Sequence, residues 1–342
     1  MAIDTFRAHL SNYRDTTLEG LLSAVPQREP QRHLYAPLSS YLSRTGKGIR
    51  PALCLATCRA FGGDALDAQP SATAIEMLHN AFLVHDDIED ESDLRRGLPT
   101  MHAEYGVPIA VNAGDMLTAL SARILRENFR VLGVPLTWRV YDEFEHMMQE
   151  SLEGQAMELG WVRDNSCDLT DDDYLRMVLK KTCWYSFIQP CRIGALIATK
   201  DGIDLDRFNR FGCYLGTAFQ IQDDLLNLIG DERRYGKEIG GDLLEGKRTL
   251  MLIHLLRQLN TRDAARLTAY LSQPRARRAT PDAQWILELM RSHGSLDYAR
   301  RIARQLAGAS LFEFTRAFAD VPQSDEKTFL HQVISYMVTR DL

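Results

Sequence analysis

The chain has 342 residues, with 40 lysines and arginines against 46 aspartates and glutamates, which gives a formal net charge of −6. This balance leaves no basic surplus for nucleic acid, so we expect no nucleic-acid partner. The start of the chain lacks a signal peptide's apolar core and no stretch is long and apolar enough for a membrane span, which together predict a cytoplasmic protein.

Helical periodicity dominates the chain and strand-like alternation is scarce. There is no Pro/Gly/Ser linker, low-complexity tract or internal repeat, so we expect a single domain over residues 1–342. Long helices throughout predict an all-α fold, a single large helical bundle with a central cavity. In chain order, the predicted helices cover about 4–23, 32–44, 49–61, 67–90, 108–132, 136–160, 171–198, 204–228, 245–259, 262–272, 281–292, 295–318 and 325–340.

Polar residues at three predicted helix starts are placed to act as N-caps. Thr170 precedes three aspartates, which suit the positive end of a helix dipole, and Ser295 and Ser324 occupy similar positions. We therefore expect these side chains to accept hydrogen bonds from the first turns.

Two acid-rich stretches, each at the C-terminal end of a predicted helix, are the most informative feature. The first contains Asp86, Asp87 and Asp90, and the second contains Asp223 and Asp224 and ends at Asn227. In each stretch the outer residues are four apart and share one helix face. Like charges so placed repel each other, whereas Mg²⁺ binds carboxylate oxygens and bridges them to a substrate's phosphates. The pair predicts a metal-diphosphate site with a carboxylate wall on either side.

A solvated helix face is the ordinary interpretation of one isolated acidic run. Here, however, both runs interrupt apolar segments, Ala81-Phe82-Leu83-Val84 before the first and Phe219-Gln220-Ile221 before the second. Carboxylates that continue an apolar helix point into a cleft more readily than into bulk water, so the pair favours a binding site.

Cationic residues recur around these clusters. Lys47 and Arg50 lie in a glycine-containing loop that precedes a helix, and the backbone amides and cations of such a loop are suited to binding an anion. His79 lies two helical turns before Asp86. Each residue alone has an ordinary explanation, because loops are solvated, lone histidines are often core residues and arginines often end helices. Further polar and charged candidates are Arg95, Arg96, Gln155, Glu158, Lys181, Thr182, Gln220, Lys237, Asp242 and Lys247.

The cysteines indicate a reducing compartment. None of the six forms a Cys-x-x-Cys unit, and several lie inside apolar runs. They are typical of reduced core residues and not of zinc ligands or a disulfide framework.

Five ordered motifs between about residues 45 and 250 resemble the trans-isoprenyl diphosphate synthases, the polyprenyl synthetase family. They are Gly46-Lys47-Gly48-x-Arg50, His79-x₅-His85-Asp86-Asp87-x-x-Asp90-x₄-Arg95-Arg96-Gly97, Gly154-Gln155-x-x-Glu158, Phe219-Gln220-x-x-Asp223-Asp224, and Gly236-Lys237-x-x-Gly240-x-Asp242-x-x-Glu245-Gly246-Lys247. The resemblance implies the isoprenoid synthase type I fold, a homodimer, and head-to-tail condensation of isopentenyl diphosphate with an allylic diphosphate.

The resemblance also implies roles for individual residues. Asp86, Asp87 and Asp90 would hold Mg²⁺ against the allylic diphosphate from one helix. Asp223 and Asp224 would do the same from the facing helix. Three Mg²⁺ ions would be present when substrate is bound. Arg95, Lys181, Lys237 and Lys247 would neutralise the leaving diphosphate. Lys47, Arg50, His79 and Arg96 would hold isopentenyl diphosphate in a metal-free pocket, and Thr182 and Gln220 would flank the reacting carbons.

Two positions depart from the family pattern. Asn227 replaces an aspartate in the second motif, which removes one negative charge, and Glu158 stands where a shorter aspartate is common. Two other functions stay open. A type I terpene cyclase has no use for a second diphosphate pocket and carries another second motif, whereas a non-catalytic regulatory subunit typically loses an acidic motif or its arginines.

In this family the growing product passes along the helix that carries the first acidic cluster. Ala81 and Phe82 lie about one turn before Asp86, and Leu78 lies about one turn deeper. These side chains would line the end of the tunnel that holds the growing product, and they neither close it with two aromatic rings nor leave it fully open. A tunnel of this intermediate depth predicts geranylgeranyl diphosphate as the product, with farnesyl diphosphate second. Alternatively, Phe82 and Leu78 are ordinary core residues and another helix sets the floor.

Overall fold

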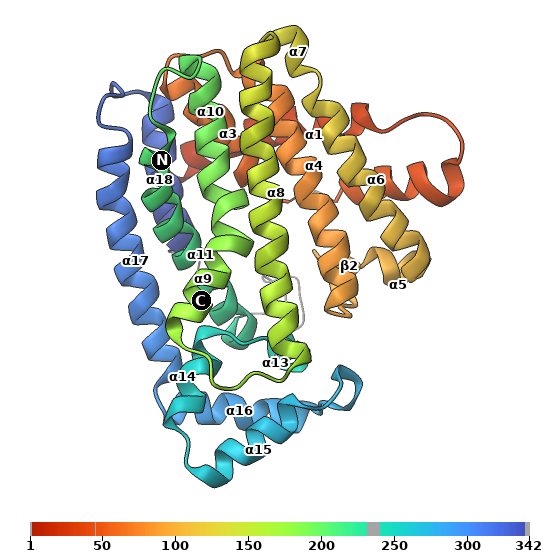
Figure 1. The fold of residues 1–342 in the computed structure, drawn as a ribbon, viewed down its shortest axis with the longest axis vertical. Coiled ribbons are helices and arrows are strands. Elements are labelled where there is room, and N and C mark those ends of the chain that lie inside the picture. Colours follow the sequence, from red (N-terminus) through yellow and green to blue (C-terminus); the bar gives the residue numbers. More distant parts are fainter. Residues whose placement is uncertain (1, 45, 231–239, 339–342) are drawn as a thin grey trace. The chain divides into compact units, whose positions relative to one another are not determined.

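The computed structural model describes residues 2–44, 46–230 and 240–338, and its helices and strands are labelled in Figure 1. The described residues form two compact units. Unit 1 comprises the described residues of Met1–Met148, Tyr185–Phe211 and Glu313–Val333, and unit 2 comprises those of Gln149–Trp184, Gly212–Phe312 and Ile334–Leu342.

Unit 1 contains most of the elements from the first half of the chain. Within it, α4 packs along α6 and α3, and α3 packs along α10 (Figure 1). Its elements are α1 (Ala2–Ala24), η1 (Gln31–Tyr35), α2 (Ala36–Leu42), α3 (Ile49–Ala60), α4 (Ala65–Glu89), β1 (Leu94–Arg95), β2 (Leu98–Pro99), α5 (Met101–Tyr105), α6 (Val107–Leu125), α7 (Asn128–Val131), α10 (Gln189–Thr199) and η3 (Leu205–Phe208).

Unit 2 contains shorter helices from the second half of the chain, among which α14 packs against α9 and α16. Its elements are α9 (Asp171–Val178), α13 (Gly241–Glu245), α14 (Leu250–Gln258), α15 (Thr261–Leu271), η4 (Arg275–Arg277) and α16 (Thr280–Ser292). Five helices include residues of both units, namely α8 (Val134–Arg163), η2 (Leu179–Ile188), α11 (Asn209–Ile229), α17 (Ser295–Ala317) and α18 (Asp325–Val338).

The predicted all-α fold is confirmed, since the strands in the described residues are the two-residue β1 and β2. Both acidic clusters lie where predicted, one at the end of α4 and one near the end of α11. Within the described residues, no helix has the length and apolar character of a membrane span.

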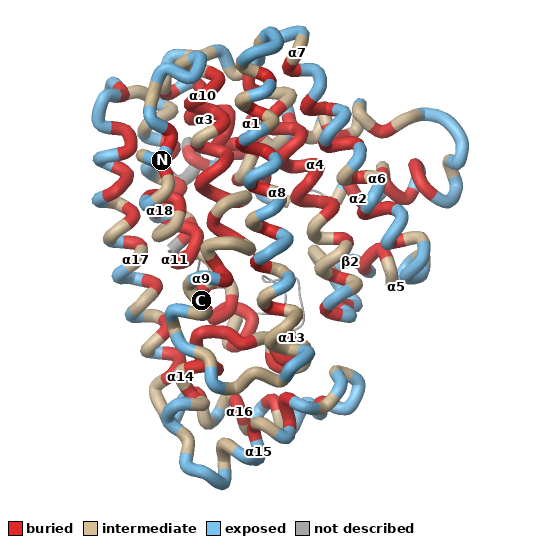
Figure 2. The backbone as a smooth tube through the Cα atoms, viewed as in Figure 1, coloured by how far each residue is buried: buried red, intermediate tan, exposed pale blue. Residues whose placement is uncertain are grey.

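The core of unit 1 is built on α3 and α4, whose buried residues form long runs in Figure 2. Close backbone approach explains the glycine at position 194 of α10. A Cβ atom there would lie 2.2 Å from the Cys54 carbonyl oxygen of α3. Because only glycine permits that contact, α10 packs directly on the α3 backbone.

The N-cap predictions were correct at two of the three positions. Thr170 and Asp173 form a reciprocal capping box at the start of α9, and the Ser324 hydroxyl accepts a hydrogen bond from the Lys327 amide at 3.2 Å. Ser295 is instead the first residue of α17, and its hydroxyl lies 3.0 Å from His254 Nδ1.

Two predicted helices begin as other helix types, 32–44 as the π-helix η1 and 204–228 as the 3₁₀-helix η3, and three more differ in extent. The helix predicted over 108–132 is interrupted after Leu125, where the Arg126 and Glu127 amides bond to carbonyls three residues back instead of four. The one predicted over 171–198 contains the π-helix η2, followed by Pro190, which has no N–H to donate. The helix predicted from 245 begins at Leu250, because Gly246 adopts a positive φ of 76° and Thr249 caps α14.

The sequence pattern missed a β-hairpin directly after the first acidic cluster. Strands β1 and β2 pair antiparallel, with Arg95 opposite Leu98, and Arg96 and Gly97 form the two-residue turn. Both turn residues have positive φ, 55° and 73°, as a type I′ turn requires. The arginine pair therefore sits on a tight ribbon and not at a helix end.

Candidate functional site

The first acidic cluster contains carboxylates in two different environments. Asp87 is fully buried, and both of its oxygens accept hydrogen bonds from Arg95 Nε, at 2.7 and 2.8 Å. Asp86 is partly exposed, with Oδ2 3.5 Å from Arg95 Nη2. Although burial opposes the charged form, pairing with Asp87 raises the pKa of Arg95. Asp87 therefore anchors Arg95, which in turn lies beside Asp86.

A second cationic group of unit 1 is assembled around Arg50. Its Nη1 lies 3.1 Å from His79 Nε2, and its Nη2 donates to the hydroxyls of Tyr185 and Ser186, each at 2.9 Å. Arg50 Nε and His79 Nδ1 are buried and have no hydrogen-bond partner among the residues that the structure describes. Because buried polar atoms are normally paired, these two atoms are exceptions within unit 1.

Burial and the neighbouring cations of Arg50, Arg96 and Arg95 lower the pKa of His79 well below its usual range, with Asp86 opposing them. Below about pH 6.5 the imidazole is protonated in the unfolded chain and stays neutral in the folded protein. The free energy of unfolding therefore decreases as the pH falls below about 6.5. Between pH 7 and pH 5, we expect the wild type to lose more thermal stability than His79→Gln, measured as Tm. Equal losses in the two proteins would contradict a neutral buried His79.

Arg96, in the turn of the hairpin, has different partners from Arg95. Its Nη1 donates to the backbone carbonyl of Arg44, and its Nη2 lies 2.7 Å from the position of a Cβ on Gly46. Gly46 thus allows the guanidinium to rest against the loop that carries Lys47, an exposed residue. The loop and the hairpin bring the two predicted cation motifs together.

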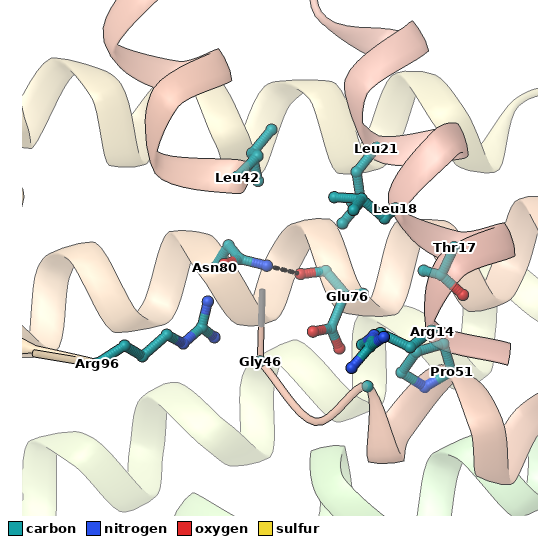
Figure 3. Close-up of a pocket in the computed structure, with 11 residues that line it drawn as sticks. Arg14, Thr17, Leu18, Leu21, Leu42, Gly46, Pro51, Glu76, Asn80 and Arg96 are labelled. Carbon is teal, nitrogen blue, oxygen red and sulfur yellow. Dashed lines mark hydrogen bonds between the residues drawn. The ribbon is translucent and has the colours of Figure 1, made fainter. Parts of the chain in front are cut away.

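A pocket of about 310 Å³, which includes open solvent, borders Arg96 (Figure 3). Arg14, Gly46, Glu76, Asn80 and Arg96 are among its lining residues, and the Asn80 amide donates to the Glu76 carbonyl at 2.8 Å. Burial raises the pKa of Glu76, and the charges of Arg50 and Arg96 oppose that shift. Its Oε2 has no hydrogen-bond partner. A carboxylate therefore lies within electrostatic range of both guanidinium groups.

The predicted chain-length residues lie on α4 in the core of unit 1. Ala81 and Leu78 are fully buried, and Phe82 is half-buried. The Phe82 ring meets Tyr185 edge to face, with centroids 5.8 Å apart. Phe82 is therefore supported by an aromatic residue from η2.

In unit 2, four residues form a continuous hydrogen-bonded chain. Thr182 Oγ1 donates to Gln220 Oε1 at 2.9 Å, and Gln220 Nε2 donates to Asp224 Oδ1 at 2.8 Å. The Tyr174 hydroxyl donates to the other Asp224 oxygen at 2.8 Å. Burial raises the pKa of Asp224 to about 7, although both hydrogen bonds oppose the shift. Asp224 anchors this chain, whereas its neighbour Asp223 is partly exposed.

The remaining candidates of unit 2 have defined partners. Lys181 Nζ donates to Glu158, and Lys247 pairs with Glu245 at 2.8 Å. Asn227 is almost fully buried, and its Oδ1 accepts a hydrogen bond from the Asp242 amide at 3.0 Å. Asn227 thereby holds the start of α13. Lys237 lies outside the described residues.

The structure brings together part of the predicted site in each unit. Asp86, Arg95, Arg50 and His79 belong to unit 1, and Thr182, Gln220 and Asp223 belong to unit 2, so that the facing arrangement of the two acidic walls stays a prediction. In the described parts of the chain, no three His, Cys, Asp or Glu side chains form a ready-made ion site. Mg²⁺ does not need one, because it is commonly bound by one or two carboxylates together with substrate phosphates.

Sequence reasoning missed Tyr185, Ser186, Tyr174 and Glu76. The first two follow Lys181-Thr182 in an apolar segment and were hidden by the prediction of a regular helix there. Glu76 carried a signal, because it is a carboxylate in the apolar run before His79 and lies three residues from it on one helix face.

Comparison with known proteins places these features in context. Residues 31–290 match the family model for polyprenyl synthetase. A geranylgeranyl diphosphate synthase of Saccharolobus solfataricus is 34% identical over 266 residues, covering 78% of each protein. The crystal structure of geranylgeranyl pyrophosphate synthetase from Pyrococcus horikoshii Ot3 covers 100% of both chains, with a TM-score of 0.87 and 30% identity. The predicted isoprenoid synthase fold is confirmed by this likeness.

One further solved structure was determined with ligands. It is a polyprenyl synthase from Caulobacter crescentus CB15, complexed with calcium and isoprenyl diphosphate. The two proteins are 25% identical, the TM-score is 0.81, and the alignment covers 98% of each chain.

Proposed function

Because the chain belongs to the polyprenyl synthetase family, we propose that it joins isopentenyl diphosphate head to tail to an allylic diphosphate, giving a short-chain all-trans prenyl diphosphate. The observation that carries the proposal is the pair of separate cation groups in unit 1. Arg95 lies beside Asp86, whereas Arg50 is assembled with His79, Tyr185 and Ser186. A condensing enzyme needs two diphosphate sites, and these groups supply one cation centre for each.

In this reaction the allylic carbon–oxygen bond breaks, the isopentenyl double bond attacks the allylic cation, and a proton leaves to the departing diphosphate. Arg95, Lys181, Lys237 and Lys247 would neutralise the allylic diphosphate as its negative charge develops, so they stabilise the transition state more than the ground state. Lys47, Arg50, His79 and Arg96 would bind isopentenyl diphosphate. Thr182, oriented by its hydrogen bond to Gln220, would flank the reacting carbons.

The donor set fits a hard divalent cation. Asp86 and Asp223 are partly exposed carboxylates, and Asp90 follows Asp86 by one turn at the end of α4. Asp86, Asp90 and Asp223 would hold Mg²⁺, as three ions with substrate bound, whose charge would stabilise the leaving diphosphate. Asp87 and Asp224, which were also predicted as ligands, would support the site through Arg95 and Gln220.

Two other functions predict different assay results. A type I terpene cyclase would convert an allylic diphosphate alone and ignore isopentenyl diphosphate. A regulatory subunit would convert neither substrate without its partner. The purified protein, with Mg²⁺, labelled isopentenyl diphosphate and a panel of allylic primers, should form labelled prenyl diphosphates. Failure to incorporate label with any primer would refute the proposed condensation.

We propose geranylgeranyl diphosphate as the main product, with farnesyl diphosphate second. Ala81→Phe should shorten the product, because a second ring beside Phe82 narrows the tunnel, and Phe82→Ala should lengthen it by opening space. Product chromatography after dephosphorylation measures both. Unchanged products in both variants would show that Ala81 and Phe82 are ordinary core residues.

Asn227 offers a test of the second acidic wall. Asn227→Asp should raise the apparent affinity for Mg²⁺, since a carboxylate replaces a neutral amide near Asp223. One of its oxygens would still accept the hydrogen bond from the Asp242 amide. The measurement is the Mg²⁺ concentration at half-maximal turnover, and equal values for the variant and wild type would exclude position 227 from the metal site.

The proposal also covers the oligomeric state and the cellular compartment of the protein. We infer a homodimer acting in the cytoplasm, with the chain working as one polyprenyl synthetase domain. All six cysteines are free thiols, which supports a reducing compartment. Size-exclusion chromatography with light scattering tests the oligomeric state.

A further inference from the structure

Tyr185 contacts residues from two parts of the proposed site. The Arg50 guanidinium lies over its ring, with Cζ 4.4 Å from the centroid, and also donates a hydrogen bond to its hydroxyl at 2.9 Å. The edge-to-face contact with Phe82 uses the same ring, at an interplanar angle of 85°. One side chain of η2 therefore supports a predicted diphosphate cation and a predicted chain-length residue.

We propose that Tyr185 is a positioning residue that fixes Arg50 for isopentenyl diphosphate and Phe82 for the growing chain, so that it contributes to both substrate affinity and product length. This inference rests on the proposed condensation. It assigns Tyr185 no contact with the reacting atoms, since each effect passes through the residue that Tyr185 touches.

The contacts of Arg50 explain the effect on affinity. A guanidinium on a flexible side chain loses rotamer freedom when it binds an anion, and preformed contacts reduce that loss. Tyr185 and Ser186 both hold Nη2, and His79 lies beside Nη1. The cation–π contact adds attraction that does not depend on the tyrosine hydroxyl.

The contact with Phe82 explains the effect on length. Phe82 is half-buried on α4, and Tyr185 packs against its ring at a centroid distance of 5.8 Å. Edge-to-face pairs of this kind restrict both rings beyond simple burial. Without Tyr185, the Phe82 ring gains freedom to turn aside, which should admit a longer chain.

The two contacts can be separated by two substitutions at one position. Tyr185→Phe removes the hydroxyl and keeps the ring, so the KM for isopentenyl diphosphate should rise about tenfold or more, as expected for loss of one hydrogen bond to a charged group, with kcat and products unchanged. Tyr185→Leu removes the ring as well. It should raise that KM at least as much and lengthen the main product by one or more isoprene units.

Three further variants complete the design. Ser186→Ala should raise only the KM, because Ser186 holds Arg50, whereas the ring contact of Phe82 is with Tyr185. Phe82→Ala should lengthen the product and raise the KM less than Tyr185→Leu does, because the Tyr185 hydroxyl still bonds to Arg50. Tyr13→Phe is the matched control. Like Tyr185, Tyr13 lies under an arginine, here Arg59, but its hydroxyl donates to Glu326 at 2.5 Å and neither partner is a proposed site residue. It should retain the wild-type KM and product.

The results distinguish this inference from the proposed function. A wild type that consumes no isopentenyl diphosphate overturns the condensation itself. An active wild type with an unchanged KM in Tyr185→Phe, or unchanged products in a folded Tyr185→Leu, overturns the role of Tyr185. Circular dichroism and Tm establish folding, and the nearly isosteric Tyr185→Phe keeps the test decisive if Tyr185→Leu does not fold.

Discussion

Replacing Asp86 or Asp223 with alanine is expected to lower kcat by a factor of about 10³ or more while the helical fold stays intact. Each substitution removes a proposed Mg²⁺ ligand, and the charge stabilisation that a metal gives a leaving group amounts to several kcal/mol, with about 1.4 kcal/mol for each factor of ten. Both aspartates are partly exposed near helix ends, so their loss leaves no buried cavity.

A matched control is Asp297→Ala. Asp297 is an exposed helical aspartate whose partner is Arg300 at 2.9 Å, and exposed ion pairs contribute little to stability. We expect wild-type turnover for this control. Steady-state kinetics at saturating Mg²⁺, with circular dichroism for folding, provides the measurement. If either Asp86→Ala or Asp223→Ala turned over at near the wild-type rate, the two acidic walls could not both hold the metal.

Replacing Arg95 with methionine is expected to reduce the free energy of unfolding by about 3–5 kcal/mol, the usual cost of leaving a buried charge without its partner. Asp87 is fully buried, and both of its oxygens face Arg95 Nε. The variant should also lose most of its activity, since Arg95 lies beside Asp86. Denaturant unfolding gives the stability change.

Adding Asp87→Asn to Arg95→Met should recover part of that stability, because the orphaned charge disappears. A double-mutant cycle measures the coupling between the two side chains. Arg139→Met is the control, since Arg139 pairs with Asp142 and Asp201 at the surface, and its loss should cost about 1 kcal/mol or less. Strict additivity of the Arg95 and Asp87 substitutions would show that the buried pair is not coupled.

The positions of the main helices along the chain were predictable, whereas the local partners of the site residues were not. Apolar periodicity set α4 and α11 and placed an acidic cluster at the end of each. Periodicity cannot say which of two adjacent aspartates is buried, because that depends on tertiary partners. Asp87 and Asp224 were predicted as ligands with their neighbours, yet they accept hydrogen bonds from Arg95 and from Gln220 and Tyr174, respectively.

The hairpin and η2 were missed for different physical reasons. Two-residue strands are too short to show alternation, and the turn depends on a positive φ at Arg96, which a sequence pattern does not favour for arginine. In η2, the wider π-helical turn changes which side chains share a face, so the α-helical pattern over 171–198 gave no reason to select Tyr185 or Ser186.

The hairpin also separates its two arginines. Arg95 lies on β1 and reaches Asp87, whereas Arg96 is the first turn residue, with a φ of 55°, and reaches the Arg44 carbonyl, although the two are identical neighbours in the sequence. Inserting or deleting one residue between Asp87 and Arg95 would change which residue occupies the β1 position that reaches Asp87 and which occupies the turn. The length of the connection after the first acidic cluster is therefore constrained as strictly as its residues. Homologous recombination or loop grafting at this point would have to conserve the number of residues between the cluster and the hairpin.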